Sequence, residues 1–117
     1  MRDFREIKVW AKAHLLTLEV YKVTATFPRE EVYGLTSQLR RSCASIPANI
    51  AEGFKKRSKS DKGRFMNISQ GSLEECRYYL ILAEDLGYGE NSDLMSQLEE
   101  VSKLLESYSR AIVASNF

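Results

Sequence analysis

Apolar residues recur three and four positions apart along most of the chain, which is the spacing of amphipathic α-helices. The chain has only two prolines and few runs of β-branched residues, so nothing in the pattern favours strands. The sequence therefore predicts an all-α fold with four helices. Their expected ranges are about Phe4 to Ala25, Pro28 to Lys56, Ser58 or Ser60 to Gly87, and the Asn91-Ser92-Asp93 cluster almost to Phe117.

The helix boundaries follow from residues that favour starts and stops. Phe27 precedes a proline and so disfavours helix, while Pro28 suits the first turn of the next helix. Either Ser58 or Ser60 can cap the third helix. Gly87 can adopt the left-handed backbone conformation that commonly ends a helix, so the third helix is expected to end there.

The predicted helices differ in how many apolar faces they have. The fourth helix has one seam, made by Leu94, Leu98, Val101, Leu105, Tyr108 and Ile112. The first helix has two nearly opposite stripes, one with Ile7, Trp10, Ala11, Leu15, Leu18 and Tyr21, the other with Val9, Ala13, Leu16, Val20 and Val23. A small bundle buries one face of a peripheral helix, so the second stripe predicts contact with another subunit. An unusually enclosed first helix is the alternative.

The second helix combines a core face with a polar stripe and a middle rich in small residues. The core face contains Leu35, Leu39, Cys43, Ile46, Ile50 and Phe54, and the polar stripe contains Gln38, Arg41, Ser45, Asn49, Glu52 and Lys56. Pro47 cannot donate a hydrogen bond to the Cys43 carbonyl, so we expect a kink or a local widening there.

The third helix is expected to bury Phe65, Ile68, Ser72, Cys76, Tyr79, Ala83 and Leu86. Gly71 lies in its interior, where glycine costs about 1 kcal/mol relative to alanine. A close helix contact at Gly71 would explain its presence.

Composition narrows the class of protein. A length of 117 residues, with 44% hydrophobic and 28% charged side chains, fits one folded domain over residues 1–117. The N-terminus is charged and no apolar run is long, so we expect neither a signal peptide nor a membrane span, and therefore a cytoplasmic protein. Two cysteines, Cys43 and Cys76, have no CxxC spacing and are expected to be buried thiols.

The sequence contains little that indicates a catalytic site. The pairs Glu74 with Glu75 and Glu84 with Asp85 are adjacent on a helix and so point about 100° apart, away from any common substrate. His14, the one histidine, has no nucleophile near it in sequence. No phosphate-binding loop, zinc motif or di-iron ExxH pair is present. We expect no enzymatic activity, no metal and no cofactor.

Charge is distributed unevenly even though the formal net charge is only +1. Residues 1–57 carry 11 basic and 6 acidic side chains, whereas residues 58–117 carry 6 basic and 10 acidic ones. The densest basic segment joins the second and third helices and contains Lys55, Lys56, Arg57, Lys59, Lys62 and Arg64. Such a cluster at one end of a bundle can contact phosphates, or it can simply be a solvated turn.

Three motifs resemble those of a known family. They are Leu35-x-x-Gln38-Leu39-Arg40-Arg41, Ser45-Ile46-Pro47-Ala48-Asn49-Ile50-Ala51-Glu52-Gly53, and Gly71-Ser72-Leu73-x-Glu75. The chain resembles the small bacterial four-helix bundle proteins encoded within intervening sequences of 23S ribosomal RNA genes. It is also similar to the accessory variability determinant of diversity-generating retroelements.

The resemblance implies an antiparallel up-down four-helix bundle that assembles into a ring-shaped homopentamer. It also implies an RNA-linked or ribosome-linked role without enzymatic activity. Within the shared motifs, the residues interpreted as structural are Arg41, Ser45, Pro47, Asn49, Glu52 and Gly53.

Two functions from different classes follow. The first is binding of structured RNA or ribosome-associated nucleic acid through Lys55, Lys56, Arg57, Lys59, Lys62 and Arg64, with help from Arg40. The alternative is a protein-binding assembly or adaptor module that has no affinity for nucleic acid and uses the acidic third and fourth helices.

Overall fold

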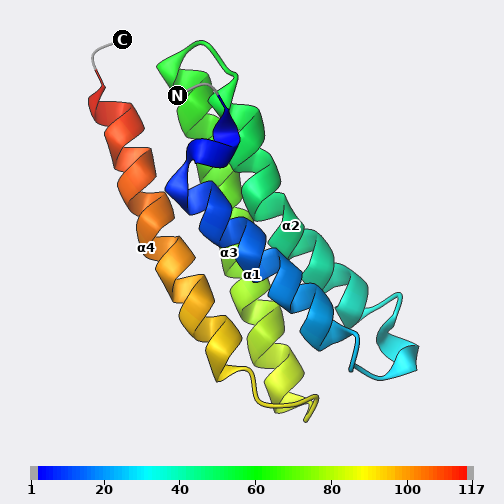
Figure 1. Ribbon diagram of the computed structural model, residues 1–117. Coiled ribbons are helices and arrows are strands. Elements are labelled where there is room, and N and C mark those ends of the chain that lie inside the picture. Colours follow the sequence, from blue (N-terminus) through cyan, green and yellow to red (C-terminus); the bar gives the residue numbers. More distant parts are fainter. Residues whose placement is uncertain (1–2, 116–117) are drawn as a thin grey trace.

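The computed structural model describes residues 3–115 and contains four α-helices, two short 3₁₀ helices and no strand in that range (Figure 1). The α-helices are α1 (Lys8–Thr24), α2 (Leu35–Phe54), α3 (Lys59–Asp85) and α4 (Ser92–Ala114). The 3₁₀ helices are η1 (Phe4–Glu6) and η2 (Arg29–Glu31). The predicted all-α fold with four helices is confirmed. The last expected helical residues, up to Phe117, lie outside the described range, as do residues 1 and 2.

The helices pack side by side in an elongated bundle of 48 × 23 × 21 Å. Both α1 and α3 contact α2 and α4. Figure 1 shows the chain reversing direction at each connection. As a result, η1, the connection between α2 and α3, and the end of α4 lie at the same end of the molecule. Within residues 3–115, no helix has the length and apolar character needed to cross a membrane.

The core contains one face of each helix. In α4 the predicted seam is confirmed, because Leu94, Leu98, Val101 and Leu105 are buried. In α1, Val9, Ala13, Leu16 and Val20 are buried. The opposite stripe is open only in its C-terminal half, where Leu15 is 53% exposed, Leu18 46% and Tyr21 45%. In its N-terminal half, Ile7 is buried and Trp10 packs against the core.

The predicted buried face of α3 is partly wrong. Ile68 and Leu86 are exposed, and the positions that fill the core are Phe65, Met66, Ser69, Leu73, Cys76, Leu80 and Ala83. Since α3 packs against both α2 and α4, its buried arc is centred between them and is rotated away from Ile68.

The first two predicted helices are each divided in two. Ile7 is extended (φ −78°, ψ 121°) and separates η1 from α1, while its side chain is buried. The turn before α2 ends at Gly34, and Glu31 compensates for the break because its Oε1 accepts a hydrogen bond from the Leu35 N–H at 3.0 Å. Glu31 also accepts from the Tyr88 hydroxyl at 2.6 Å, which ties this turn to the connection after α3.

The ends of α3 match the prediction more closely. Ser58 is the N-cap, since its hydroxyl accepts from the Asp61 N–H at 3.0 Å, and Ser60 lies inside the helix. At the other end, Gly87 has φ +82°. The N–H groups of Gly87 and Tyr88 bond to the carbonyls of Glu84 and Ala83, which is a Schellman ending.

Asn91 is the first residue of the predicted cap of α4, but its side chain makes no cap hydrogen bond. Its amide donates instead to the Leu80 carbonyl of α3 at 2.7 Å. The cap is supplied by Glu90, which accepts from the Ser92 N–H at 2.6 Å.

The middle of α2 tolerates Pro47 because neighbouring helices supply hydroxyl groups. The helix continues through Pro47, which is buried. The Cys43 carbonyl, which has lost its helical donor, lies 3.4 Å from the Thr17 hydroxyl of α1, and Ser69 of α3 donates to the Ile46 carbonyl at 2.9 Å. Polar groups next to the proline are therefore hydrogen-bonded across helix contacts.

Helices α2 and α3 approach each other closely at Gly53. A Cβ atom there would lie 2.7 Å from Met66 Cε and 2.9 Å from Phe65 Cβ. Gly71 differs from this, since no atom lies within 4 Å of its ideal Cβ position. The close contact predicted at Gly71 does not exist within the described chain.

We predict that Gly53→Ala destabilises the protein by about 1–3 kcal/mol, because the Phe65 Cβ belongs to a rigid part of α3 and must move. Denaturant unfolding measures this change. Gly63→Ala in α3 is the control, since its Cβ meets no atom within 4 Å, and it should gain up to about 1 kcal/mol in helix propensity. Equal stability of the two variants would contradict the proposed contact.

We also predict that Glu31→Gln lowers the melting temperature near neutral pH. Hydrogen bonds from Tyr88 and from the Leu35 N–H hold the pKa of Glu31 below its ordinary value of 4.5. A depressed pKa in the folded state stabilises the protein above pH 4.5, and this contribution is lost as the pH falls through the folded-state pKa. The difference from wild type should therefore disappear in acid. Glu30→Gln, at an exposed carboxylate with no hydrogen bond among the described residues, is the control and should leave the melting temperature nearly unchanged near neutral pH.

Candidate nucleic-acid interface

A tight connection gathers cationic side chains at one end of the bundle. Only residues 55–58 separate α2 from α3, and the Ser58 cap begins α3 at once. Six cations lie in the connection or in the first two turns of α3, and together we call them the basic turn: Lys55, Lys56, Arg57, Lys59, Lys62 and Arg64. The structure thus brings together six of the seven predicted nucleic-acid-binding residues.

Two phenylalanine rings support four of these cations. Lys56 Nζ lies 5.0 Å and Arg64 Cζ 4.9 Å from the centre of the Phe65 ring. Lys62 Nζ lies 5.7 Å and Lys55 Nζ 6.0 Å from the centre of the Phe54 ring. Cation–π attraction holds the charged groups near the surface of the bundle.

Two lysines of the basic turn bind carbonyl oxygens at helix ends. Lys62 donates to the Phe54 carbonyl at 2.8 Å, at the C-terminus of α2. Lys59 donates to the Val113 carbonyl at 3.2 Å and to the Ser115 carbonyl, at the C-terminus of α4. Each lysine therefore neutralises the negative end of a helix dipole.

Little acidic charge opposes the basic turn. Arg64 pairs with Asp61 at 3.9 Å, and the other five cations have no carboxylate within ion-pair distance among residues 3–115. Asp3 has a pKa lowered to about 2, chiefly because the side chain and backbone of Arg5 donate to it, with a smaller contribution from the charge of Lys55.

Arg40, which was predicted to assist, does not lie with the basic turn. Its Nε donates to the Thr24 hydroxyl at 2.8 Å and its Nη2 to the Tyr21 carbonyl at 3.2 Å. Its guanidinium also lies 4.6 Å from the centre of the Tyr21 ring. Fourteen residues of helix, about 21 Å, separate Arg40 from the end of α2, so it caps α1 instead.

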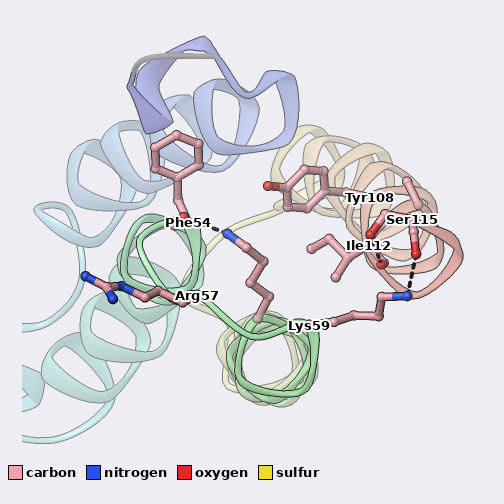
Figure 2. Close-up of a pocket in the computed structure, with 8 residues that line it drawn as sticks. Phe54, Arg57, Lys59, Tyr108, Ile112 and Ser115 are labelled. Atoms are coloured by element: carbon pink, nitrogen blue, oxygen red, sulfur yellow. Dashed lines mark hydrogen bonds between the residues drawn. The ribbon is translucent and has the colours of Figure 1, made fainter. Parts of the chain in front are cut away.

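A cavity of about 280 Å³ lies beside the basic turn, between the end of α2, the start of α3 and the end of α4 (Figure 2). Its walls are largely apolar and are formed by Phe54, Arg57, Lys59, Lys62, Tyr108, Ala111, Ile112 and Ser115. The sequence pattern does not predict this cavity, although Phe54 ends the apolar face of α2 and Tyr108 and Ile112 end that of α4.

The polar stripe of α2 is only partly joined by hydrogen bonds. Asn49 donates to the Ser45 carbonyl at 2.8 Å and to the Ser45 hydroxyl at 2.9 Å, and this hydroxyl lies 2.8 Å from the Ser72 hydroxyl of α3. The side chains of Arg41 and Glu52 are exposed and hydrogen-bond to none of the described residues.

The residues considered for catalysis have other neighbours. His14 stacks on Trp10 with ring centres 5.0 Å apart. Cys43 and Cys76 are free and buried, as expected, and the hydrogen bond with Cys43 together with burial raises the pKa of the Cys76 thiol. Within residues 3–115, no three His, Cys, Asp or Glu side chains are grouped so as to hold a metal ion.

Comparison with known proteins identifies relatives of this bundle. A family described as 23S rRNA-intervening sequence protein matches residues 5–107. A crystal structure of a protein of unknown function from the S23 ribosomal protein family of Bacteroides thetaiotaomicron is similar, with a TM-score of 0.78 and 25% sequence identity. That similarity covers 87% of this chain and 95% of the other. No curated protein shows a significant match. Since the family match spans most of the bundle, the chain belongs to the 23S rRNA-intervening sequence protein family.

Proposed function

We propose that the protein is a non-enzymatic bundle that binds structured RNA, or ribosome-associated nucleic acid, through the basic turn. One observation carries the proposal: five of the six cations at this end have no carboxylate partner among residues 3–115. Unpaired cations held close together by aromatic rings suit the repeated negative charges of a phosphate backbone.

Phosphate contacts would provide affinity with little discrimination between bases. Lys55, Lys56 and Arg57 have no ion pair and donate no hydrogen bond to a backbone carbonyl among the described residues, so their charges are free for phosphates. The family description refers to 23S rRNA, and the similar crystal structure is assigned to a ribosomal protein family. Both agree with an RNA partner.

We also propose that the protein is located in the cytoplasm. The free thiols of Cys43 and Cys76 agree with a reducing compartment.

We further propose that the antiparallel, up-and-down bundle assembles into a ring-shaped homopentamer. The outer stripe of α1, with Leu15, Leu18 and Tyr21 about half exposed, offers apolar surface for a second copy. On α3, Gly71 has open space above it and Ile68 is exposed nearby, which would let another helix approach closely. A ring would place several basic turns around one axis.

We predict that reversing the charges of Lys55, Lys56 and Arg57 to Glu weakens RNA binding at low salt by at least about tenfold. The slope of the logarithm of the affinity against the logarithm of the salt concentration should also fall by about three, one for each phosphate that is no longer neutralised. Fluorescence anisotropy with a labelled RNA hairpin at several salt concentrations measures both quantities.

The matched control reverses Lys22, Arg29 and Lys103, which are exposed and lie outside the basic turn. It changes the net charge equally and should bind RNA nearly as well as wild type. Unchanged RNA binding by the Lys55, Lys56 and Arg57 variant would refute the site. Absence of RNA binding by the wild type, with a co-purifying polypeptide, would favour a protein adaptor instead.

We predict that Leu15→Glu with Leu18→Glu converts the assembly into monomers of about 13.4 kDa, because each contact between neighbouring subunits would bury two new charges against an apolar surface. Light scattering measures the mass. Val32→Glu, at an exposed position in the turn before α2, serves as the control and should leave the assembly intact. A monomeric wild type at micromolar concentration would contradict the ring.

A further inference from the structure

The cavity beside the basic turn combines a small apolar space with cationic walls. Its volume of about 280 Å³ falls just below the range of about 300–1,000 Å³ that is typical of pockets for drug-sized ligands. The space therefore suits one small ring system rather than an extended molecule.

Two aromatic rings and two aliphatic side chains, Ala111 and Ile112, form the apolar walls. Phe54 and Tyr108 come from α2 and α4, and Ile112 lies one turn beyond Tyr108. Figure 2 shows the Tyr108 hydroxyl directed toward Phe54. Burial raises the pKa of Tyr108, so this hydroxyl stays protonated at neutral pH and can donate a hydrogen bond. It has no hydrogen-bond partner among the described residues.

The cations around the cavity retain unused donors. An ammonium group has three N–H donors. Lys62 uses one on the Phe54 carbonyl, and Lys59 uses two on the Val113 and Ser115 carbonyls. Arg57 hydrogen-bonds to none of the described residues, and Figure 2 shows its guanidinium pointing away from the other labelled side chains. Lys62 therefore keeps two donors, Lys59 keeps one and Arg57 keeps all of its donors for phosphates at this end of the bundle.

We infer that the cavity binds one unpaired nucleotide of an RNA. The base lies against Phe54 and Tyr108, its own phosphate contacts Lys62 and Lys59, and the next phosphate contacts Arg57. This inference rests on the proposed RNA binding and specifies its target. A base inside a duplex is stacked on both faces and cannot enter, so the preferred RNA contains a bulge or a single-stranded segment.

The test compares two labelled hairpins whose strands are joined by a polyethylene-glycol linker instead of a nucleotide loop, with the same number of base pairs, one fully paired and one with a single unpaired adenosine. Ala111→Trp fills the cavity from an exposed position without removing a cation. It should weaken binding of the bulged hairpin at least fivefold, as expected when one base no longer stacks, and leave the paired hairpin unaffected. Ser107→Trp, an exposed residue of the same helix outside the cavity walls, should bind both hairpins as wild type does.

Tyr108→Leu provides a second variant, which removes one aromatic wall and should abolish the preference for the bulged hairpin. Equal affinity of wild type and Ala111→Trp for the bulged hairpin, or equal losses for both hairpins, would overturn the inference while leaving RNA binding by the basic turn in place. Failure of wild type to bind either hairpin would overturn both proposals. Adenosine monophosphate that binds more tightly than the bulged hairpin would assign the cavity to a free nucleotide instead.

Discussion

The close approach of α2 to α3 at Gly53 determines the shape of the charged end of the bundle. Met66 and Phe65 occupy the space that a side chain at position 53 would need, so the two helices meet almost where they are joined. A connection of four residues, 55–58, is then long enough. Because the helices are in contact up to their ends, Phe54 and Phe65 lie at the edge of the core, and their rings are the surfaces on which Lys55, Lys56, Lys62 and Arg64 rest.

The packing of α2 against its neighbours also depends on small hydroxyl-bearing residues around Pro47. Pro47 removes one backbone donor from α2, and the Thr17 hydroxyl lies close to the carbonyl that this leaves. Ser69 and Ser72 of α3 reach the Ile46 carbonyl and the Ser45 hydroxyl. Larger side chains at these positions would separate the helices and leave polar groups unpaired in the core. The motif rich in small residues is therefore explained by packing over most of its length, while Arg41 and Glu52 remain on the outer surface.

Periodicity predicted those parts of the fold that depend on one helix at a time. The seam of α4, the core face of α2, the Ser58 cap and the stop at Gly87 all follow from local sequence, and the structure contains them. The buried arc of α3 does not follow, because it depends on where α2 and α4 lie. For the same reason Arg40 could be counted with the basic turn from its charge alone, whereas in the bundle it meets the end of α1. The cavity was also beyond prediction, since its walls come from three helices.

Helix dipoles decide which of the cations at this end are available to a partner. The C-termini of α2 and α4 both lie near the basic turn and carry partial negative charge, which Lys62 and Lys59 offset through hydrogen bonds to terminal carbonyls. The N-terminus of α3 adds partial positive charge at the same end. These two lysines therefore contribute less to the outward field than their formal charges indicate. The field that an approaching polyanion meets comes mainly from Lys55, Lys56 and Arg57, because Asp61 partly balances Arg64. In the proposed complex, the cations that attract the RNA and the residues that line the cavity are therefore largely different sets that share Arg57, so attraction of an RNA and recognition of one of its nucleotides would be separable.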